Sequence, residues 1–267
     1  MNPFLLVIIL GIVEGMTEFV PVSSTGHMIL VERFINSPLV SKTFMENFLV
    51  IIQFGAILSV VAYFWNDLTP FVKTKEEFKE KLSLWTKIIV GVLPAGVIGL
   101  LADDYISEFF MDNTTIVASM LILYGIIFIL VERKNLMGGI GSIKEMSYKL
   151  AFTIGFFQCL AMIPGTSRSG ATIVGALLLG VSRSVAAEYS FFLAIPTMAG
   201  ATLLKLVKNG LNFTPLEWQL LAVGSVVSFV VAYVVIKWFM GYIKKKTFMA
   251  FGVYRIILGI LVLLLMK

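Results

Sequence analysis

The sequence has a single cysteine and a single histidine among its 267 residues. One cysteine cannot form an intramolecular disulfide, and together the two residues cannot supply the roughly four Cys or His ligands of a structural zinc site. Charged residues are also scarce, at 14% of the chain, against about 25% in an ordinary globular domain. These shortages exclude a disulfide framework and a Cys/His zinc centre, and they argue against a water-soluble fold.

Apolar residues take the place of the missing charge. They make up 58% of the chain, and the mean hydropathy is +0.95. A helix needs roughly 20 apolar residues to cross a bilayer, and six stretches meet this length, so the sequence predicts an all-α polytopic membrane protein with one integral membrane domain, 1–267. The predicted spans are about 48–65, 84–102, 115–132, 186–207, 217–238 and 248–266.

Two further apolar runs, 4–13 and 150–157, are too short to span, and each leads into a polar break that contains proline. Broken helices of this kind are typical of re-entrant hairpins, in which the non-helical backbone is buried in protein. We therefore predict two re-entrant helical hairpins, about 3–36 and 147–181.

The two hairpin sequences resemble each other. GIVEGMTEFVPVSSTGHMI (11–29) and GFFQCLAMIPGTSRSGATI (155–173) share a leading glycine, a polar residue three positions on, a proline, a hydroxyl-rich loop and a closing glycine. Chance similarity between apolar segments is the alternative, but the polar positions match as well. The pattern predicts an inverted-topology repeat, about 1–132 and 147–267, that brings the two breaks together near the middle of the membrane.

The positive net charge of +5 comes from loops between the apolar stretches. Lysine and arginine gather in loops 66–87, 133–149 and 239–247, and the positive-inside rule places these loops on the cytoplasmic side. Their basic residues therefore indicate membrane orientation rather than a surface that binds nucleic acid. Loop 208–216 has one lysine, and all charged residues of loop 103–114 are acidic, so these two loops are assigned to the outer side. Both termini are then predicted to lie on the outer side of the membrane, and no nucleic-acid partner is expected. The acidic residues of loop 103–114 are Asp103, Asp104, Glu108 and Asp112.

Each break ends in a hydroxyl-rich loop directly before a second helix. Backbone N–H groups and the positive helix end there favour an anion, and Arg168 adds a planar fork that can hold two phosphate oxygens. The alternative for Arg168 is a structural ion pair with Glu14, Glu18 or Glu188. The predicted substrate-binding residues are Ser23, Thr25, Gly26, Gly165, Thr166, Ser167, Ser169, Gly170 and Thr172.

Glu14 and Glu18 are four residues apart, so they project from one helix face. Two close carboxylates repel, which favours either a general acid or base or a divalent cation such as Mg²⁺ or Ca²⁺. The alternative is that one caps the break and the other pairs with Arg168. His27 lies three residues after Ser24, where it would activate a hydroxyl nucleophile, although a lone histidine is more often simply hydrogen-bonded.

Three polar residues of the predicted spans carry weaker signals. Gln53 would line the cavity or bond to a neighbouring helix. Tyr254 and Arg255 lie six to seven residues into the last span. We expect this pair to snorkel toward the membrane surface.

The motifs VEGMTEFVPVSSTGHM and PGTSRSGATI resemble the two signatures of undecaprenyl pyrophosphate phosphatases of the bacitracin-resistance type, and the similarity extends over essentially the whole chain. The resemblance implies removal of the terminal phosphate from a C55 polyprenyl diphosphate, a reaction that recycles the lipid carrier for peptidoglycan synthesis. It places the protein in a bacterial plasma membrane, with the site open to the outer side. It also implies the catalytic set Glu14, Glu18, Ser24, His27 and Arg168. Whether Ser24 is phosphorylated or only orients water stays open.

A transporter is the rival class, since inverted repeats with broken helices are typical of transporters. The protein would then flip a lipid phosphate or carry an anion coupled to an ion, with Glu14 and Glu18 as proton sites. Membrane lipids are expected partners in either case. A homodimer is compatible with the sequence and is left open.

Overall fold

The computed structural model describes the chain except for residues 36–39, 111–112, 135–138, 210–211 and 267, and the side chains of 33, 102–110 and 208–209 are also outside the description. The described residues form helices and no strand, apart from one isolated bridge between Ile140 and Val181. The elements are α1 (Pro3–Thr17), α2 (Ser24–Phe34), α3 (Lys42–Tyr63), α4 (Trp65–Leu68), α5 (Lys75–Phe110), α6 (Thr114–Arg133), η1 (Ile143–Glu145), α7 (Tyr148–Cys159), η2 (Leu160–Met162), α8 (Arg168–Leu178), α9 (Arg183–Asn209), α10 (Pro215–Ile243) and α11 (Met249–Leu265).

Five of these helices, α3, α5, α6, α9 and α10, are long and apolar enough to cross a membrane. The architecture is therefore that of a multi-pass membrane protein. The sixth predicted span corresponds to α11, which has 17 residues and falls just short of that length. Within the predicted connection 66–87, α5 begins at Lys75 with an alternating charged turn and continues without a break into the span.

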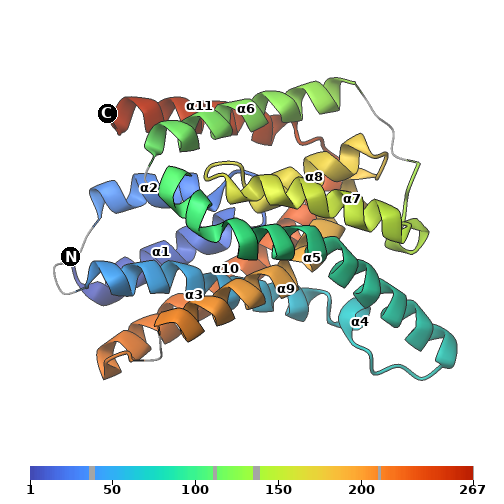
Figure 1. Ribbon diagram of the computed structural model, residues 1–267, viewed down its shortest axis with the longest axis horizontal. Coiled ribbons are helices and arrows are strands. Elements are labelled where there is room, and N and C mark those ends of the chain that lie inside the picture. Colours follow the sequence, from blue (N-terminus) through green and yellow to red (C-terminus); the bar gives the residue numbers. More distant parts are fainter. Residues whose placement is uncertain (36–39, 111–112, 135–138, 210–211, 267) are drawn as a thin grey trace.

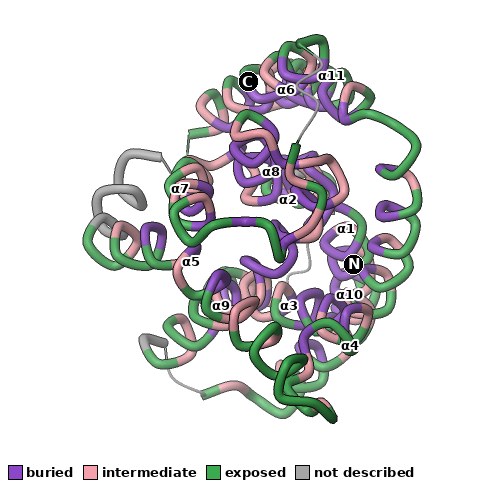
Figure 2. The backbone as a smooth tube through the Cα atoms, turned by 90° about the vertical axis from the view of Figure 1, so that its right-hand side faces the viewer, coloured by how far each residue is buried: buried purple, intermediate pink, exposed green. Residues whose placement is uncertain are grey.

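Two helix–break–helix units, α1–α2 and α7–α8, occupy the positions of the predicted hairpins. Serine or asparagine side chains cap the entry of each unit: Asn2 accepts the backbone N–H of Phe4 at 2.8 Å, and Ser147 accepts that of Leu150 at 3.1 Å. Such caps satisfy backbone donors that a helix start leaves free. Figure 2 shows α2 and α8 toward the middle of the bundle, with buried backbone around them.

Each unit packs on a helix from the other half of the chain. α1 lies against α10, and α7 lies against α5. Glycine allows both approaches: a Cβ on Gly15 would lie 2.7 Å from the Ser228 carbonyl oxygen, and one on Gly155 would collide with the carbonyl of Gly91. Backbones this close gain dispersion energy in a membrane, where the hydrophobic effect does not drive helix association.

The remaining long pairs close the bundle around these units. α6 packs on α11, and α3 on α10 and α9. At one end Arg183 holds the buried Glu132 through Nη2 at 2.6 Å and Nε at 3.0 Å, and Glu132 also accepts the N–H of Phe248 at 2.8 Å. Three helices are thereby joined by a bidentate ion pair.

Both termini lie at the same end of the bundle, and α4 and the start of α5 lie at the opposite end (Figure 1). Large apolar side chains such as Leu93, Val230 and Ile257 are about half exposed on the outer faces, as expected for surfaces in contact with lipid. The acidic side chains of loop 103–114, on which part of the orientation prediction depends, are outside the described residues: Asp103, Asp104, Glu108 and Asp112.

Candidate active site

The two breaks end in the same unusual backbone conformation. Ser23, which precedes α2, has φ 71° and ψ 99°, and Ser167, which precedes α8, has φ 72° and ψ 125°. They are the non-glycine residues with positive φ in the described part of the chain. Each side chain accepts the backbone N–H three residues on, from Gly26 at 3.4 Å and Gly170 at 3.2 Å. Strain of this kind persists where the surrounding structure holds it, often at functional sites.

Glu18 is the centre of the polar cluster between the breaks. Its Oε2 accepts a hydrogen bond from Ser24 Oγ at 2.8 Å, and its Oε1 forms an ion pair with Arg168 Nη2 at 3.0 Å. The side chains of Glu18 and Arg168 are only 8% and 11% exposed. A carboxylate, a hydroxyl and a guanidinium from two hairpins thus meet in a poorly solvated place, where their electrostatic interactions are strong.

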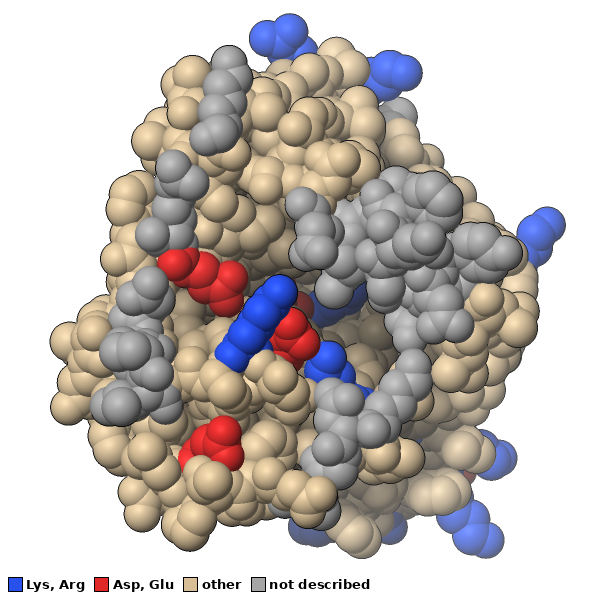
Figure 3. Space-filling model, turned by 60° about the vertical axis from the view of Figure 1, so that its left-hand side comes forward, with Lys and Arg blue, Asp and Glu red and all other residues tan. Residues whose placement is uncertain are grey.

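The cluster lines one wall of a cavity of about 190 Å³. The first hairpin lines it with Glu18, Ser23, Ser24 and Thr25, the second with Pro164, Gly165, Ser167 and Arg168, and α3 and α9 with Gln53, Thr197 and Met198. The expectation that Gln53 lines the cavity is confirmed. Figure 3 looks toward the end that carries both termini and shows a hollow in which acidic and basic side chains gather.

Arg168 is held from several sides. Nη1 donates to the Ser190 carbonyl at 2.9 Å, and the guanidinium lies 5.9 Å from the centre of the Phe19 ring. Its buried Nε has no hydrogen-bond partner among the described residues. The ion pair considered as the alternative for Arg168 is therefore formed, with Glu18, and one donor of the guanidinium still lacks an acceptor.

The carboxyl group of Glu14 lies beside Glu18, and the charge of Arg168 acts on both. Glu14 is 1% exposed, and its Oε1 is buried with no hydrogen-bond partner among the described residues. A buried, unpaired carboxylate oxygen is costly unless a proton or cation satisfies it. Glu14 does not line the cavity, so it lies next to Glu18 on the side away from the cavity.

His27 is turned away from Ser24. Its Nδ1 lies 2.8 Å from the Ser23 carbonyl oxygen, and its Nε2 lies 2.7 Å from Tyr254 Oη. The expected contact between His27 and the Ser24 hydroxyl is therefore replaced by the bond from Ser24 to Glu18. The spacing placed both residues on one helix turn, but the strained Ser23 carbonyl competes for the imidazole.

Several predicted substrate-binding residues lie behind the cavity wall rather than on it. Ser169 Oγ reaches the carbonyl oxygens of Glu18 at 3.3 Å and Val20 at 3.4 Å. Thr172 Oγ1 lies 2.7 Å from Ser190 Oγ. These bonds brace the second hairpin against the first and against α9. The predicted residues that do not line the cavity are Gly26, Thr166, Ser169, Gly170 and Thr172.

Arg255 does not snorkel, and that expectation was wrong. Its side chain is fully buried, and it donates through Nη1 to Pro21 O at 3.2 Å and through Nη2 to the carbonyls of Gly165 and Thr166, both at 2.8 Å. One guanidinium on α11 therefore joins both breaks. The sequence does carry one indication of this role: an arginine inside a membrane span is energetically costly, so it usually marks a functional or structural site.

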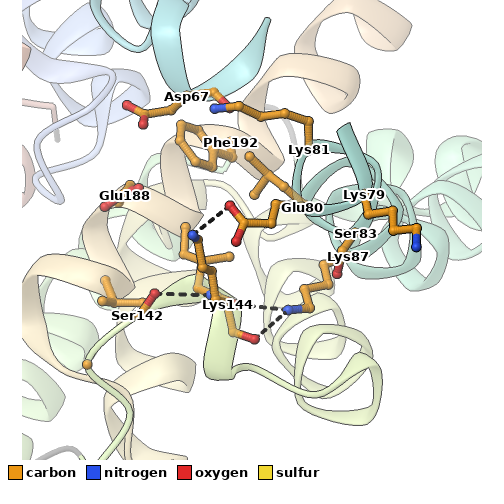
Figure 4. Close-up of a pocket in the computed structure, with 14 residues that line it drawn as sticks. Asp67, Lys79, Glu80, Lys81, Ser83, Lys87, Ser142, Lys144, Glu188 and Phe192 are labelled. Carbon is orange, nitrogen blue, oxygen red and sulfur yellow. Dashed lines mark hydrogen bonds and ion pairs between the residues drawn. The ribbon is translucent and has the colours of Figure 1, made fainter. Parts of the chain in front are cut away.

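A larger cavity, about 530 Å³, lies at the other end of the molecule (Figure 4). Three of the four lysines that line it are bonded to protein: Lys144 Nζ to Glu80 at 2.7 Å, Lys87 Nζ to the carbonyls of Ile143 at 2.9 Å and Lys144 at 3.0 Å, and Lys81 Nζ to the carbonyl of Asn66 at 2.6 Å. These contacts fasten α5 to η1 and α4. The candidate active site is therefore the smaller cavity, where the Ser24 hydroxyl contacts the Glu18 carboxylate.

A family model described as bacitracin resistance protein BacA matches residues 7–261. The chain belongs to the BacA family. Among BacA-type relatives, an undecaprenyl-diphosphatase of Fusobacterium nucleatum is 64% identical over 98% of this chain and its own full length. An undecaprenyl-diphosphatase of Clostridioides difficile is 58% identical over 96% of this chain and 93% of its own, and one of Desulfitobacterium hafniense is 55% identical over 96% and 94%. Within this BacA chain, both motifs border one cavity.

Proposed function

We propose that this protein is an undecaprenyl-diphosphatase, which hydrolyses undecaprenyl diphosphate to the monophosphate and inorganic phosphate. The observation that carries the proposal is the contact of Ser24 with Glu18 and of Glu18 with Arg168 at the wall of one cavity. A nucleophile, a proton acceptor and a phosphate-binding fork are the parts that phosphoryl transfer requires. The names of the relatives supply the lipid. In the cell the reaction recycles the lipid carrier for peptidoglycan and confers bacitracin resistance.

In the first step Ser24 Oγ attacks the terminal phosphorus while its proton passes to Glu18 Oε2, 2.8 Å away. The bond from that phosphorus to the bridging oxygen breaks, and the undecaprenyl monophosphate leaves with the bonding electron pair. Water then attacks the phosphoserine and releases phosphate, and the proton on Glu18 returns to Ser24. Accumulation of a phosphoserine on rapid quenching distinguishes this route from direct attack by an oriented water.

Arg168 and the two helix starts would hold the diphosphate. The start of α2 and that of α8 both border the cavity, so their backbone N–H groups and helix dipoles favour the anion there. The free Nε of Arg168 supplies a further donor. His27 stays in the proposed catalytic set: its Nδ1 bonds the carbonyl of Ser23, directly before the Ser24 hydroxyl.

The carboxylates fit a divalent cation, Mg²⁺ or Ca²⁺, because Glu14 Oε1 is buried without a partner beside Glu18. Mg²⁺ is commonly held by one or two carboxylates together with substrate phosphates. When bound, the cation would neutralise negative charge on the diphosphate. Glu14 and Glu18 are its proposed ligands.

We propose six spans and two re-entrant hairpins as an inverted repeat, with both termini and the cavity mouth outside the plasma membrane. The exchanged packing of α1 on α10 and α7 on α5 supports the repeat. A cysteine at Asn212 in a background without Cys159 should react with an impermeant thiol reagent in intact cells, and one at Lys79 should not. Labelling at Lys79 from outside would contradict this orientation.

Phosphate release tests the proposal against the transporter alternative. The purified protein in detergent should release phosphate from a short, soluble polyprenyl diphosphate, and excess chelator should suppress the release. No second compartment exists in detergent, so turnover there requires an enzyme. Uptake or flipping in vesicles without phosphate release would favour the lipid-phosphate flippase or anion transporter.

A further inference from the structure

The phenol of Tyr254 joins α11 to the first hairpin through the imidazole of His27. Oη lies 2.7 Å from Nε2, and the two rings are stacked, with centroids 5.6 Å apart and planes at 9°. The other ring nitrogen, Nδ1, lies 2.8 Å from the Ser23 carbonyl oxygen. Both nitrogens of His27 are therefore occupied, one by the break and one by α11.

These partners determine the tautomer of a neutral imidazole. A carbonyl oxygen only accepts, so Nδ1 carries the hydrogen and donates it to Ser23. Nε2 then has the lone pair, and the Tyr254 hydroxyl is the donor. An imidazole held at both nitrogens has a fixed ring plane.

The bond reaches the nucleophile through the strained residue Ser23. The carbonyl of Ser23 accepts the Nδ1–H of His27 and, at 3.4 Å, its backbone N–H. Ser23 has φ 71° and directly precedes Ser24. A side chain that holds this carbonyl therefore holds the turn that aims the Ser24 hydroxyl at Glu18.

The second hairpin shows that the turn itself does not need this device. Ser167 has φ 72°, yet the position that matches His27 in the repeat alignment is Ala171, which has no polar side-chain atom. The strained turn forms there without an imidazole: Ser167 caps the helix, its carbonyl accepts the N–H of Ala171 at 2.9 Å, and Arg255 bonds the two preceding carbonyls. The imidazole and phenol are thus present at the hairpin that carries the hydroxyl nucleophile.

We propose that Tyr254 is a positioning residue of the reaction: its hydroxyl donates to His27 Nε2 and thereby holds the Ser23–Ser24 turn in its reactive geometry. The inference rests on the proposed function, since it assigns a role in that reaction. Tyr254 does not line the cavity, so it acts through His27. Its loss should lower kcat more than it raises KM.

The test uses the fact that His27 is the single histidine of the sequence. Nitrogen NMR of protein with isotope-labelled histidine reports both ring nitrogens without overlap. At a pH where the ring is neutral, the wild type should show a protonated Nδ1 and a hydrogen-bonded, unprotonated Nε2. Tyr254→Phe keeps the stacked ring, and in this variant the Nε2 resonance should move toward that of a free imine nitrogen. A protonated Nε2 in the wild type, or no change in Tyr254→Phe, would overturn the proposal.

Activity gives the second readout. We expect Tyr254→Phe to lower kcat about tenfold with KM nearly unchanged, as for other residues that orient a reacting group. Tyr233→Phe, a half-exposed tyrosine on α10, is the matched control and should keep full kcat and the wild-type NMR spectrum. Full kcat in a folded Tyr254→Phe protein would also overturn the positioning role. If the wild type released no phosphate, the hydrolase proposal itself would fail, and the NMR spectrum would show whether the Tyr254–His27 contact exists independently.

Discussion

The two hairpins have nearly the same backbone and very different side chains. Ser23 and Ser167 share a positive φ near 70°, at 71° and 72°, and both cap the helix that follows. The matched positions of the first and second hairpin are Glu14 and Gln158, Glu18 and Met162, Ser24 and Arg168, and His27 and Ala171. The first hairpin thus carries the carboxylates and the hydroxyl, whereas the second carries the guanidinium.

The difference shows how the site is built: one half of the chain supplies the negative charge and the other half supplies the positive charge. Two identical hairpins would place either two copies of Glu18 or two guanidinium groups at one small cavity, and either pair would repel. In the structure, Glu18 of the first hairpin contacts Arg168 of the second at 3.0 Å. The shared backbone supplies two helix starts, and the divergence of side chains supplies the chemistry.

Removing the hydroxyl of the first hairpin should have the largest effect. Ser24→Ala deletes the proposed nucleophile and should lower kcat on the order of 10³-fold or more, because no other group replaces it. The control Ser147→Ala alters a hydroxyl of the second hairpin that caps α7 and does not line the cavity, and it should keep most of the activity. Phosphate release under saturating lipid measures both variants, and an active Ser24→Ala protein would assign Ser24 to orientation only.

Replacing the guanidinium of the second hairpin should come next. Arg168→Lys keeps the charge beside Glu18 but loses the planar fork, so kcat/KM should fall on the order of 10²-fold with little change in melting temperature. Arg183→Lys is the matched control, since it alters an ion pair with Glu132 away from the cavity. It should destabilise the protein while preserving the activity of the folded fraction. A stable, almost fully active Arg168→Lys protein would refute a phosphate clamp.

The matched pair Glu14 and Gln158 allows a reciprocal exchange. Glu14→Gln should lower activity 10- to 100-fold, as for residues that support a metal or a catalytic group, and a smaller dependence on Mg²⁺ should accompany the loss. Glu18→Gln should lose more, because Glu18 contacts Ser24 directly.

Gln158→Glu should leave the chemistry of the cavity unchanged and cost about 2 kcal/mol or more, since it buries a carboxylate without a matching cation. Metal titration of phosphate release and thermal melting separate the two effects. An Mg²⁺ dependence of Glu14→Gln identical to that of the wild type would argue against Glu14 as a ligand.

The smallest expected difference concerns the caps. Ser167→Ala removes the acceptor of the Gly170 N–H and should destabilise the protein by about 1 kcal/mol. Ser23→Ala should cost less, because the Ser23 cap is longer, 3.4 Å against 3.2 Å, and His27 also holds that turn. Thermal melting in detergent measures the difference, and an equal loss at both positions would argue against the contribution of His27.

Local features of this protein were predictable from sequence. Apolar length located the spans, and polar breaks in short apolar runs located the helix–break–helix units. Because Arg168, Glu18 and Ser24 all lie in or next to these breaks, their meeting at one cavity followed from the expectation that the breaks approach each other.

Contacts between distant helices were not predictable in the same way. Helical periodicity shows which face a residue occupies, but it does not show which helix covers that face. Tyr254 and His27 are 227 positions apart, and nothing in either local sequence indicates the other. The same limit applies to Arg255, whose carbonyl partners have no sequence signal. His27 was expected to contact Ser24 because the sequence shows only which residues are close along the same helix.

The exchange of partners between halves also constrains how the protein is made. During synthesis α1 enters the membrane long before α10, the helix that it packs against, has been translated. Until then the face of α1 that carries Gly11 and Gly15 lacks the helix that covers it. Arg168, the cation near Glu14, is also translated later, so this carboxylate must stay near water or find a temporary partner. The first hairpin is therefore synthesised early but reaches its final packing late. A ribosome stalled before Pro215 should carry a chain whose first hairpin is accessible to protease, and the protection should arrive only with α10.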